Sequence, residues 1–389
     1  MTLVAATNDD VACEASSALE VIVARDAGAL AALERDWDAL AENVPFRTYR
    51  WAMTWWRHYR QEDRELFVAL VVNAAGELVG VAPWYLETSA REGRVLRLLG
   101  SGEVCSDYQT VLCREALVAP VAACLAEWLA GEVADRWQLL DLAGVANADP
   151  AVAELGRQMV AHGHIVDHRA EANAWSVELP ADWDQYLSTL SRTRRERTRQ
   201  MLRRLVDPGR AVAYEVQNPQ ELDRAFDILI ELHQRRRQSL DQPGCFASPR
   251  FTAFHRDMAR QLLSAGQLRL RWIELDGRPI AAEYSLVGGE TIYYYQGGFE
   301  PDAANDRPGW LAFATSLKDA ISGGYQTFDF LRGDEAYKAS WGAEPKALVR
   351  VRIIGRQPAA RARYAAWRSS QTLKRWARHW LRPSEEGNE

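Results

Sequence analysis

The order of predicted elements in residues 181–356 limits the fold of this chain more than any other sequence feature. Apolar patterns predict a strand, two helices, three consecutive strands, a helix, a strand, a short helical segment and a last strand, at residues 211–217, 219–238, 248–266, 267–275, 278–288, 289–299, 309–324, 327–331, 334–342 and 347–355. Three consecutive strands pair antiparallel, and a helical crossover then adds a further strand. A mixed sheet packed by helices is therefore predicted.

The first 180 residues show the same kind of order. The strands ELFVALVVN and ELVGVAPWYLET form a hairpin around the turn NAAGE, and helices alternate with later strands. No short-period repeat is present, so the duplication is one of architecture. We predict an α/β (α+β) fold of two tandem lobes, 1–180 and 181–356, each a mixed, mainly antiparallel sheet flanked by helices, with a basic tail at 357–389.

Composition places the chain among globular proteins. Hydrophobic residues make up 48% and charged residues 26% of its 389 residues, both close to globular averages. No run of 18 apolar residues occurs, and the start MTLVAATNDD lacks the features of a secretory signal. The five cysteines form no CxxC pair and are expected to be reduced thiols. We expect a cytoplasmic protein, with peripheral contact at the inner membrane face left open.

Positive charge is concentrated in the second half of the chain. Residues 1–180 carry a net charge of −13 and residues 181–389 a net charge of +7. Eight arginines at 191–210 form a basic helix. The helix could simply be a solvated face, or it could attract the phosphates of a carrier or of an acceptor linked to a lipid or nucleotide. Residues 350–382 hold ten basic residues and no acid, and 366–382 are amphipathic on a helical wheel. Contact with anionic lipid or with the protein itself is favoured over RNA.

Familiar catalytic and metal motifs do not occur. The chain has no P-loop, nucleophile elbow, HExxH, EF-hand loop or dinucleotide fingerprint. His162, His164 and His168 could share one face of a strand, but no cysteine or carboxylate cluster completes a metal shell. A solvated turn and strand is the favoured interpretation, and no metal cofactor is predicted.

Residues 268–346 carry the most specific signal. The pieces DGRPIAAEY, YYYQGGF, a Pro-Gly pair opening a helix, and FDFLRGDEAYKASWG follow in this order. With the upstream LSRTRRERTRQMLRRL, FRTYRWAMTWWRHY and SDYQTVLC, they resemble CelD-like proteins, a cellulose-biosynthesis-associated branch of the GNAT acyltransferase superfamily. The resemblance covers nearly the whole chain up to about residue 356. It implies two GNAT-like lobes and an acyltransferase whose chemistry lies in the second lobe.

The segment YKASWG is also similar to Fem-type aminoacyltransferases, which extend peptidoglycan bridges using aminoacyl-tRNA. Its Tyr337, Lys338, Trp341 and Gly342 match a Phe-Lys pair followed by an aromatic-Gly pair. The resemblance implies catalytic positions at Tyr337 and Lys338, with Lys338 near the acyl carbonyl or its leaving group. On general grounds, a lysine just past a buried strand can donate to a developing oxyanion. The alternative is a solvated helix lysine.

The GNAT resemblance also implies where the donor binds. GNAT members use backbone amides of one splayed central strand and the N-terminus of the next helix. Glycines permit close backbone approach, and free amides at a helix start suit a pyrophosphate. The implied donor-binding residues are Tyr295, Gln296, Gly297, Gly298, Arg307 and Gly309. The usual Gln/Arg-x-x-Gly-x-Gly/Ala loop is reduced here to RPGW, so acyl-CoA, acyl carrier protein and aminoacyl-tRNA all stay open as donors.

Glu283 is a carboxylate in an otherwise apolar predicted strand, IAAEYSL. Burial raises the pKa of a carboxyl group, which brings it into the range useful for a general base. The alternative is a structural ion pair with an arginine such as Arg332.

Acceptor-binding residues are expected at two places. Asp329, Arg332 and Asp334 follow the end of the strand TFDFL, and strand ends commonly carry sites. Asp107 and Tyr108 stand in a bend of the first lobe, and the CelD-like resemblance implies that they face the cleft between the lobes. The alternatives are a loop cap for Asp329 and an Asx-type turn with a packed tyrosine for Asp107 and Tyr108.

These inferences predict an N-acyltransferase that moves an acyl group from a thioester to an amine of a cell-envelope or exopolysaccharide precursor. The acceptor is expected to be a small molecule or to be linked to a lipid or nucleotide. Two alternatives stay open: a Fem-type enzyme that uses aminoacyl-tRNA, the only nucleic acid expected as a partner, and a non-catalytic accessory protein of polysaccharide synthesis.

Overall fold

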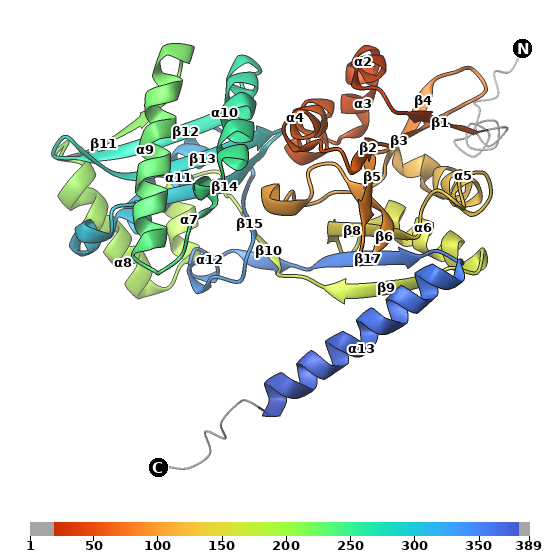
Figure 1. Cartoon of the computed structure of the whole chain (residues 1–389). Helices are drawn as coiled ribbons and strands as arrows, with labels where there is room; N and C mark the ends of the chain where they lie inside the picture. The colour runs from red at the N-terminus through yellow and green to blue at the C-terminus, as the bar shows by residue number, and fades with distance from the viewer. Residues whose placement is uncertain (1–18, 381–389) are drawn as a thin grey trace, which may run out of the picture.

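The computed structural model describes residues 19–380, apart from the side chains of residue 304 and of residues 371–380. Figure 1 shows two lobes side by side, the first in red to yellow and the second mainly in green and cyan. The elements that begin in the first lobe are β1 (Glu20–Ala24), α2 (Ala27–Leu30), α3 (Glu34–Leu40), α4 (Tyr49–Tyr59), β2 (Arg64–Leu66), β3 (Val68–Val72), β4 (Leu78–Ala82), β5 (Trp84–Ser89), β6 (Gly93–Leu98), β7 (Leu112–Cys113), α5 (Val118–Ala130), β8 (Leu139–Ala146), α6 (Pro150–Ala161) and β9 (Ile165–Ala170).

The second lobe follows the predicted order of elements. Its elements and those after it are β10 (Ala174–Glu178), α7 (Trp183–Thr189), α8 (Arg192–Met201), β11 (Ala211–Glu215), α9 (Pro219–Gln238), α10 (Pro249–Ser264), β12 (Leu268–Leu275), β13 (Arg278–Gly288), β14 (Thr291–Phe299), α11 (Pro308–Ser322), β15 (Thr327–Arg332), α12 (Ala336–Ser340), β16 (Glu344–Lys346), β17 (Leu348–Ile354) and α13 (Pro358–Trp380). They build a seven-stranded sheet in the order β11-β12-β13-β14-β15-β10-β16, antiparallel except for the β14–β15 pair. The predicted mixed, mainly antiparallel sheet is confirmed.

Local sequence explains where the two long helices of the second lobe begin. Asn218 caps α9 by accepting hydrogen bonds from the amides of Gln220 and Glu221, and Ser248 caps α10 by accepting one from Phe251. In both helices proline holds the first helical position, where its missing amide hydrogen costs nothing. The two helices pack on the sheet beside β12, β13 and β14, and so fix one wall of the site described below.

The first lobe contains two sheets where one was predicted. Its strands form a four-stranded sheet in the order β1-β3-β4-β7 and a six-stranded sheet in the order β2-β5-β6-β8-β17-β9. Each of the two predicted hairpin strands breaks, at Phe67 and at Pro83, and its halves join different sheets. Pro83 has no amide hydrogen for a sheet ladder, which accounts for a break at this position.

The lobes exchange strands across the predicted boundary. Strand β10 precedes residue 180 but lies in the sheet of the second lobe, whereas β17 precedes residue 356 but pairs with β8 and β9 of the first lobe. Whether residues 180 and 356 are the limits of independently folding units stays a prediction. The exchange ties the two lobes together through the sheets themselves.

A shared apolar core also joins the lobes. Trp51 and Trp55 of α4 are fully buried, and Trp51 packs edge-on against Phe254 of α10 with ring centroids 5.1 Å apart. Burying side chains of this size stabilises the contact by about 2–3 kcal/mol each. The relative position of the lobes, and with it the space between them, is therefore set by packing.

The basic segments differ from their predicted form. The basic helix predicted at 191–210 begins as α8 and passes into a π-helical stretch, and Leu190 separates it from α7. Helix α13 begins at Pro358, and its Trp367 ring lies between Arg169 and Arg352, 3.7 and 4.2 Å from their guanidinium carbons. This half of the tail thus docks on the first lobe, while the predicted apolar face beyond residue 370 lies outside the described side chains. No helix between residues 19 and 380 combines the length and hydrophobicity needed to cross a bilayer.

Candidate active site

An opening between β14 and β15 defines the candidate active site. These parallel strands pair only where residues 291–293 meet residues 327–329. Beyond that point β14 stays with β13, and β15 stays with β10, so the two central strands diverge. A bulge at Tyr295, where the register of β14 on β13 shifts, lies at the start of the divergence. The predicted splayed strand is thus present.

The divergence leaves backbone amides of β14 facing the opening. The Glu300 amide donates to the Ile280 carbonyl, and donors along an antiparallel strand alternate between its two sides. The amides of Phe299 and Gly297 therefore point away from β13, toward the space between the strands. Such fixed dipoles can donate to an oxyanion without reorganisation.

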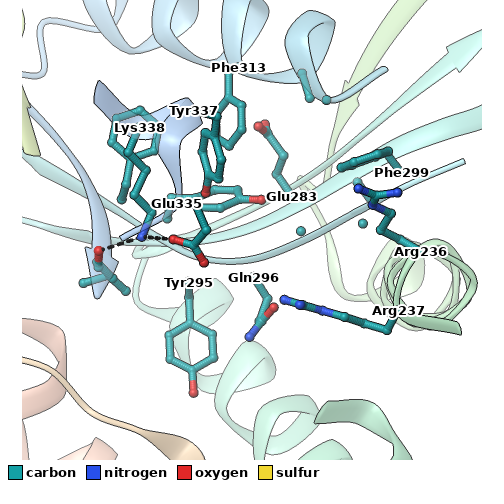
Figure 2. Close-up of a pocket in the computed structure, with 18 of the residues that line it drawn as sticks. Arg236, Arg237, Glu283, Tyr295, Gln296, Phe299, Phe313, Glu335, Tyr337 and Lys338 are labelled. Carbon is teal, nitrogen blue, oxygen red and sulfur yellow. Dashed lines mark hydrogen bonds and ion pairs between the residues drawn. The ribbon is translucent and has the colours of Figure 1, made fainter. Parts of the chain in front are cut away.

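A cavity of about 1050 Å³ occupies the opening and continues between the lobes. Figure 2 shows side chains from the sheet, α9, α11 and α12 around it. The predicted site residues among its lining are Asp107, Glu283, Tyr295, Gln296, Gly297, Gly298, Arg307, Gly309, Arg332, Tyr337 and Lys338. Tyr108, Asp329 and Asp334 are not part of the lining. One cavity therefore collects eleven of the fourteen predicted residues, although their functions stay predictions.

Glu283 lies directly opposite Gly297 in the β13–β14 ladder. The residue is 5% exposed, and burial raises the pKa of this carboxyl to about 7 although the Arg271 guanidinium and the nearby Ser316 hydroxyl oppose the rise. The Arg271 nitrogen is 3.6 Å from Glu283 Oε2, and Oε1 has no hydrogen-bond partner among the described residues. The alternative of a structural ion pair with an arginine is therefore met by Arg271 on the neighbouring strand and not by Arg332, which pairs with Asp107. A buried carboxyl with a free oxygen and a pKa near neutrality suits a general base.

The two conspicuous glycine positions serve packing. A Cβ on Gly298 would stand 2.2 Å from the His233 backbone nitrogen, so glycine lets α9 approach β14. A Cβ on Gly309 would meet the Phe299 ring at 3.3 Å. Both residues line the cavity, but their close neighbours are the protein's own backbone and aromatic ring. Direct approach of a donor to these glycines stays a prediction.

Lys338 is buried, so the interpretation as a solvated helix lysine is wrong. Its side chain is 2% exposed, and Nζ donates to the carbonyls of Leu331, Arg332 and Gly333, each at 3.0 Å. Glu335 Oε2 lies 2.9 Å from Nζ. Because an ammonium has three hydrogens, these carbonyls satisfy its donor capacity. In this structure Lys338 holds the irregular end of β15 in place.

The predicted tyrosines lie in two different environments. Tyr337 stacks on Phe313 at 5.2 Å, and burial raises the pKa of its hydroxyl above its usual value, so it stays protonated. Tyr295 donates to the Val104 carbonyl of the first lobe and lies 3.1 Å from His255 Nε2. Tyr295 therefore lines the cavity, but its hydroxyl hydrogen bond is made to the first lobe and not to the cavity.

Asp107 and Arg332 link the lobes at the cavity wall. The Asp107 carboxylate accepts from the Arg332 guanidinium and, at 2.8 Å, from the Arg332 amide. Burial raises the pKa of Asp107 although the Arg332 guanidinium opposes the rise. These predicted acceptor ligands are thus already paired with each other across the lobe boundary. Asp334 lies outside the cavity, where it accepts from Asn173 and Trp175.

Tyr108 and Asp329 form a second link between the lobes. The Tyr108 hydroxyl donates to Asp329 Oδ2 at 2.6 Å, while Oδ1 accepts from the Leu331 amide at 2.7 Å. Leu331 has φ 57°, a left-handed conformation that costs energy for a bulky residue. Burial raises the pKa of Asp329 to about 6. This carboxyl therefore supports the bend that turns β15 into the Lys338 segment.

Replacing Tyr108 by phenylalanine is expected to destabilise the protein by about 1–3 kcal/mol, because a buried acceptor loses its donor. The loss should be larger at pH 8 than at pH 5. Asp329, whose folded pKa is raised to about 6, is charged at pH 8 and neutral at pH 5. Urea unfolding at both pH values measures this, with the exposed Tyr214→Phe as control. Equal losses at both pH values would argue against the role of Asp329.

Several residues that line the cavity were not identified individually from the sequence. Arg194, Arg236, Arg237 and Trp310 line the cavity. The run Arg235-Arg236-Arg237 could have indicated such a residue. Three adjacent helix positions point in different directions, so at least one of these arginines is expected to face the protein and not the solvent. The short segment between α9 and α10, with Cys245, also lines the cavity.

The histidine group does not form a metal site in the described part of the chain, where no three His, Cys, Asp or Glu side chains come together. His164 is buried, stacks on Trp137 at 5.2 Å, and has Nδ1 3.1 Å from the Ile354 carbonyl. Its interpretation as part of a solvated turn is wrong.

The cavity, the diverging strands and the buried carboxyl together make up the candidate active site. Comparison with known families gives the class: the acetyltransferase (GNAT) domain family matches residues 192–339, from α8 to α12. Residues 192–339 therefore form a GNAT acetyltransferase domain, which supports acyltransferase activity for the protein. No curated protein sequence matches the chain.

Solved structures extend the likeness to both lobes. A structure described as FemX matches with a TM-score of 0.57 and 13% identity, over 81% of this chain and 95% of that one. A conserved protein of unknown function from Bacteroides thetaiotaomicron matches with a TM-score of 0.53 and 12% identity, over 83% and 97%. At these identities the likeness shows a shared two-lobed fold. A tandem GNAT protein from the clavulanic acid biosynthesis pathway has a TM-score of 0.47 and 13% identity, over 88% and 99%.

Proposed function

We propose that this protein transfers an acyl group from a thioester to an amine in the opening between β14 and β15. The observation that carries the proposal is Glu283, a buried carboxyl with one free oxygen, opposite the Gly297 amide and with a pKa raised to about 7. An amine must lose a proton when it forms an amide, and a carboxylate of this pKa accepts one near neutral pH.

Each step of the proposed reaction is assigned to residues of the cavity. The acceptor nitrogen attacks the thioester carbonyl carbon and Glu283 takes the nitrogen's proton, directly or through one water. The amides of Gly297 and Phe299 donate to the carbonyl oxygen as it becomes negative. Collapse of the tetrahedral species breaks the carbon–sulfur bond and forms the amide. The thiolate leaves with a hydrogen bond from the Tyr337 hydroxyl, which stays protonated because burial raises its pKa, and the proton that Glu283 took from the amine passes to the thiolate or to solvent.

The cavity residues fit a phosphate-bearing thioester such as acyl-CoA. Arg194 and Arg307 lie 4.4 and 5.9 Å from the Trp310 ring at the start of α11, and both line the cavity. A carrier's phosphates can bind there while its long pantetheine arm reaches the diverging strands. When bound, the thioester supplies the activated carbonyl. The same cations suit the phosphates of acyl carrier protein or aminoacyl-tRNA, so the donor is tested directly.

The test is incubation of the full chain with acyl-CoA, acyl carrier protein thioester or aminoacyl-tRNA, together with a panel of amines, followed by mass spectrometry. Amide formation from a thioester, lost in Glu283→Gln, is the expected result. Transfer from aminoacyl-tRNA alone would identify a Fem-type enzyme instead. No transfer from any donor would leave the accessory-protein alternative.

The acceptor that we propose is an amine of a cell-envelope or exopolysaccharide precursor. This choice rests on the resemblance of FDFLRGDEAYKASWG and YYYQGGF to CelD-like proteins. Amino sugars and their lipid-linked or nucleotide-linked forms therefore belong in the amine panel.

Replacing Arg194 by alanine is expected to raise the donor KM about tenfold, because one charge-assisted hydrogen bond to phosphate is lost. The acceptor KM should change little. The matched control is Arg192→Ala, on the same helix but exposed and paired with Glu196. Steady-state kinetics with each substrate varied in turn gives both constants. An unchanged donor KM in Arg194→Ala would place the phosphates elsewhere.

A further inference from the structure

The cavity holds more positive charge than its own carboxylates neutralise. Six cationic side chains line it: Arg194, Arg236, Arg237, Arg307, Arg332 and Lys338. Arg332 pairs with Asp107, and Lys338 pairs with Glu335. The other four arginines have no ion pair with any described carboxylate, although such pairs are common among the arginines elsewhere in residues 19–370. Unpaired guanidinium groups in one cavity indicate anionic ligands.

The carboxylates of the cavity, in contrast to these arginines, mostly have partners. Glu103 accepts from Tyr59 and Ser248, while Glu300 pairs with Arg235 at 2.6 Å. Asp107 and Glu335 have the partners just described. Among these carboxylates, Glu283 is the one with an oxygen, Oε1, that is both buried and without a hydrogen-bond partner in the described part of the chain. The cavity therefore offers unpaired cations and one proton acceptor, which suits a ligand that carries both an anionic group and an amine.

The four unpaired arginines fall into two places. Arg194 and Arg307 lie against Trp310, and Arg236 lies over Phe299 at 4.8 Å, beside the start of α11. Arg237 lies apart from them. Figure 2 shows its guanidinium extending from α9 toward Gln296, below Glu283.

Arg237 acts on the groups at the centre of the cavity. Its charge opposes the rise in pKa that burial causes at Tyr337, Tyr294 and Cys245. Within the described residues, the guanidinium of Arg237 donates one hydrogen bond, to the Gln242 side chain, 2.9 Å away and five residues along the chain. Arg235 lies two residues earlier on the same helix. Its charge, unlike that of Arg237, is neutralised by Glu231 and Glu300.

We propose that Arg237 binds an anionic group, carboxylate or phosphate, that the amine acceptor carries close to its reacting nitrogen. The inference rests on the proposed function and narrows its acceptor to anionic amines. The donor's phosphates do not fit this position, because the pantetheine arm separates them from the thioester that must lie beside Glu283 and Gly297. They fit the three arginines around Trp310 and Phe299. Arg237 is thus a specificity residue that orients the amine toward Glu283.

The test compares matched amines with and without the anionic group. Alanine is paired with alaninamide, and glucosamine 6-phosphate with glucosamine, so that carboxylate and phosphate are examined separately. Each amine is measured as acyl acceptor by mass spectrometry and, without donor, as ligand by isothermal titration calorimetry. The variants are Arg237→Gln and, as matched control, Arg235→Gln.

At least one anionic amine is expected to have a kcat/KM about 10- to 100-fold above its neutral partner, and a correspondingly lower Kd, because a charge-assisted hydrogen bond is formed. Arg237→Gln should abolish this preference and Arg235→Gln should keep it. A cooperative urea unfolding transition with the wild-type midpoint shows that Arg237→Gln is folded, and the ratio of the two amines within each variant removes any general effect of the substitution on the rate.

Equal binding and turnover of anionic and neutral amines by the wild-type protein overturns the inference and leaves the proposed function standing. A preference that survives in Arg237→Gln also overturns it. If no amine is acylated, the proposed function fails. Calorimetry then still decides whether Arg237 binds the anionic group, since no donor is present in that arm.

Discussion

Replacing Glu283 by glutamine is expected to lower kcat by about 10²- to 10⁴-fold, the usual contribution of a general base. The substitution keeps the size of the side chain and removes its ability to accept the amine's proton. The KM for the donor should change little, since the proposed site for the donor's phosphates lies near Trp310 and not at Glu283. Multiple-turnover kinetics with the acceptor found in the transfer assay measures the effect.

The control for this variant is Glu290→Gln, which changes an exposed glutamate in the turn before β14 and should keep full activity. Stability gives a second control. The folded pKa of Glu283 is raised to about 7, so its contribution to stability is lost as the pH rises through 7. At pH 8 the glutamine variant should therefore be at least as stable as the wild-type protein. A stable variant with unchanged kcat would remove Glu283 from the mechanism.

Replacing Lys338 by methionine is expected to have the largest effect on stability, a loss of about 3 kcal/mol or more. The reason is that the carbonyls of Leu331, Arg332 and Gly333 lose their shared donor at a buried position. The irregular end of β15 would lose its support, and Asp107 would lose the geometry of its contact with the Arg332 amide. Chemical denaturation at pH 7 gives the free energy of unfolding.

The matched control is Lys318→Met on α11, where the lysine is exposed. It should change stability by no more than about 0.5 kcal/mol. Unchanged stability of Lys338→Met together with a large fall in kcat would contradict the structural role. That result would return Lys338 to the oxyanion-binding role that the Fem-type resemblance implies.

The second-lobe sheet was predictable from sequence because its signals are local. The meander of β12, β13 and β14 consists of consecutive strands with tight turns, and the caps of α9 and α10 are visible as Asn218-Pro219 and Ser248-Pro249. The exchange of β10 and β17 was not predictable in the same way. Apolar patterning says that a strand is buried on a sheet, but it does not say on which of two similar sheets.

The site was predictable as a set of positions and less so as a set of contacts. Burial of Glu283 followed from its apolar strand, whereas its partner Arg271 depends on the register between β12 and β13. Lys338 was recognised by its motif. Its three carbonyl partners depend on the left-handed bend at Leu331, and no sequence pattern predicts this bend. The unpaired state of Arg237 is a property of the whole cavity and could only be seen in the structure.

The most direct test of the central claim is the pH dependence of kcat/KM for acyl transfer to an acceptor whose own amine pKa lies below about 6, so that the amine is neutral throughout. A base acts in its deprotonated form, so the rate should rise about tenfold per pH unit below 7 and level off above a midpoint near 7, the raised pKa of Glu283. In Glu283→Gln the remaining activity should lack this midpoint. A wild-type profile that keeps the same midpoint in Glu283→Gln would contradict the assignment of Glu283 as the base.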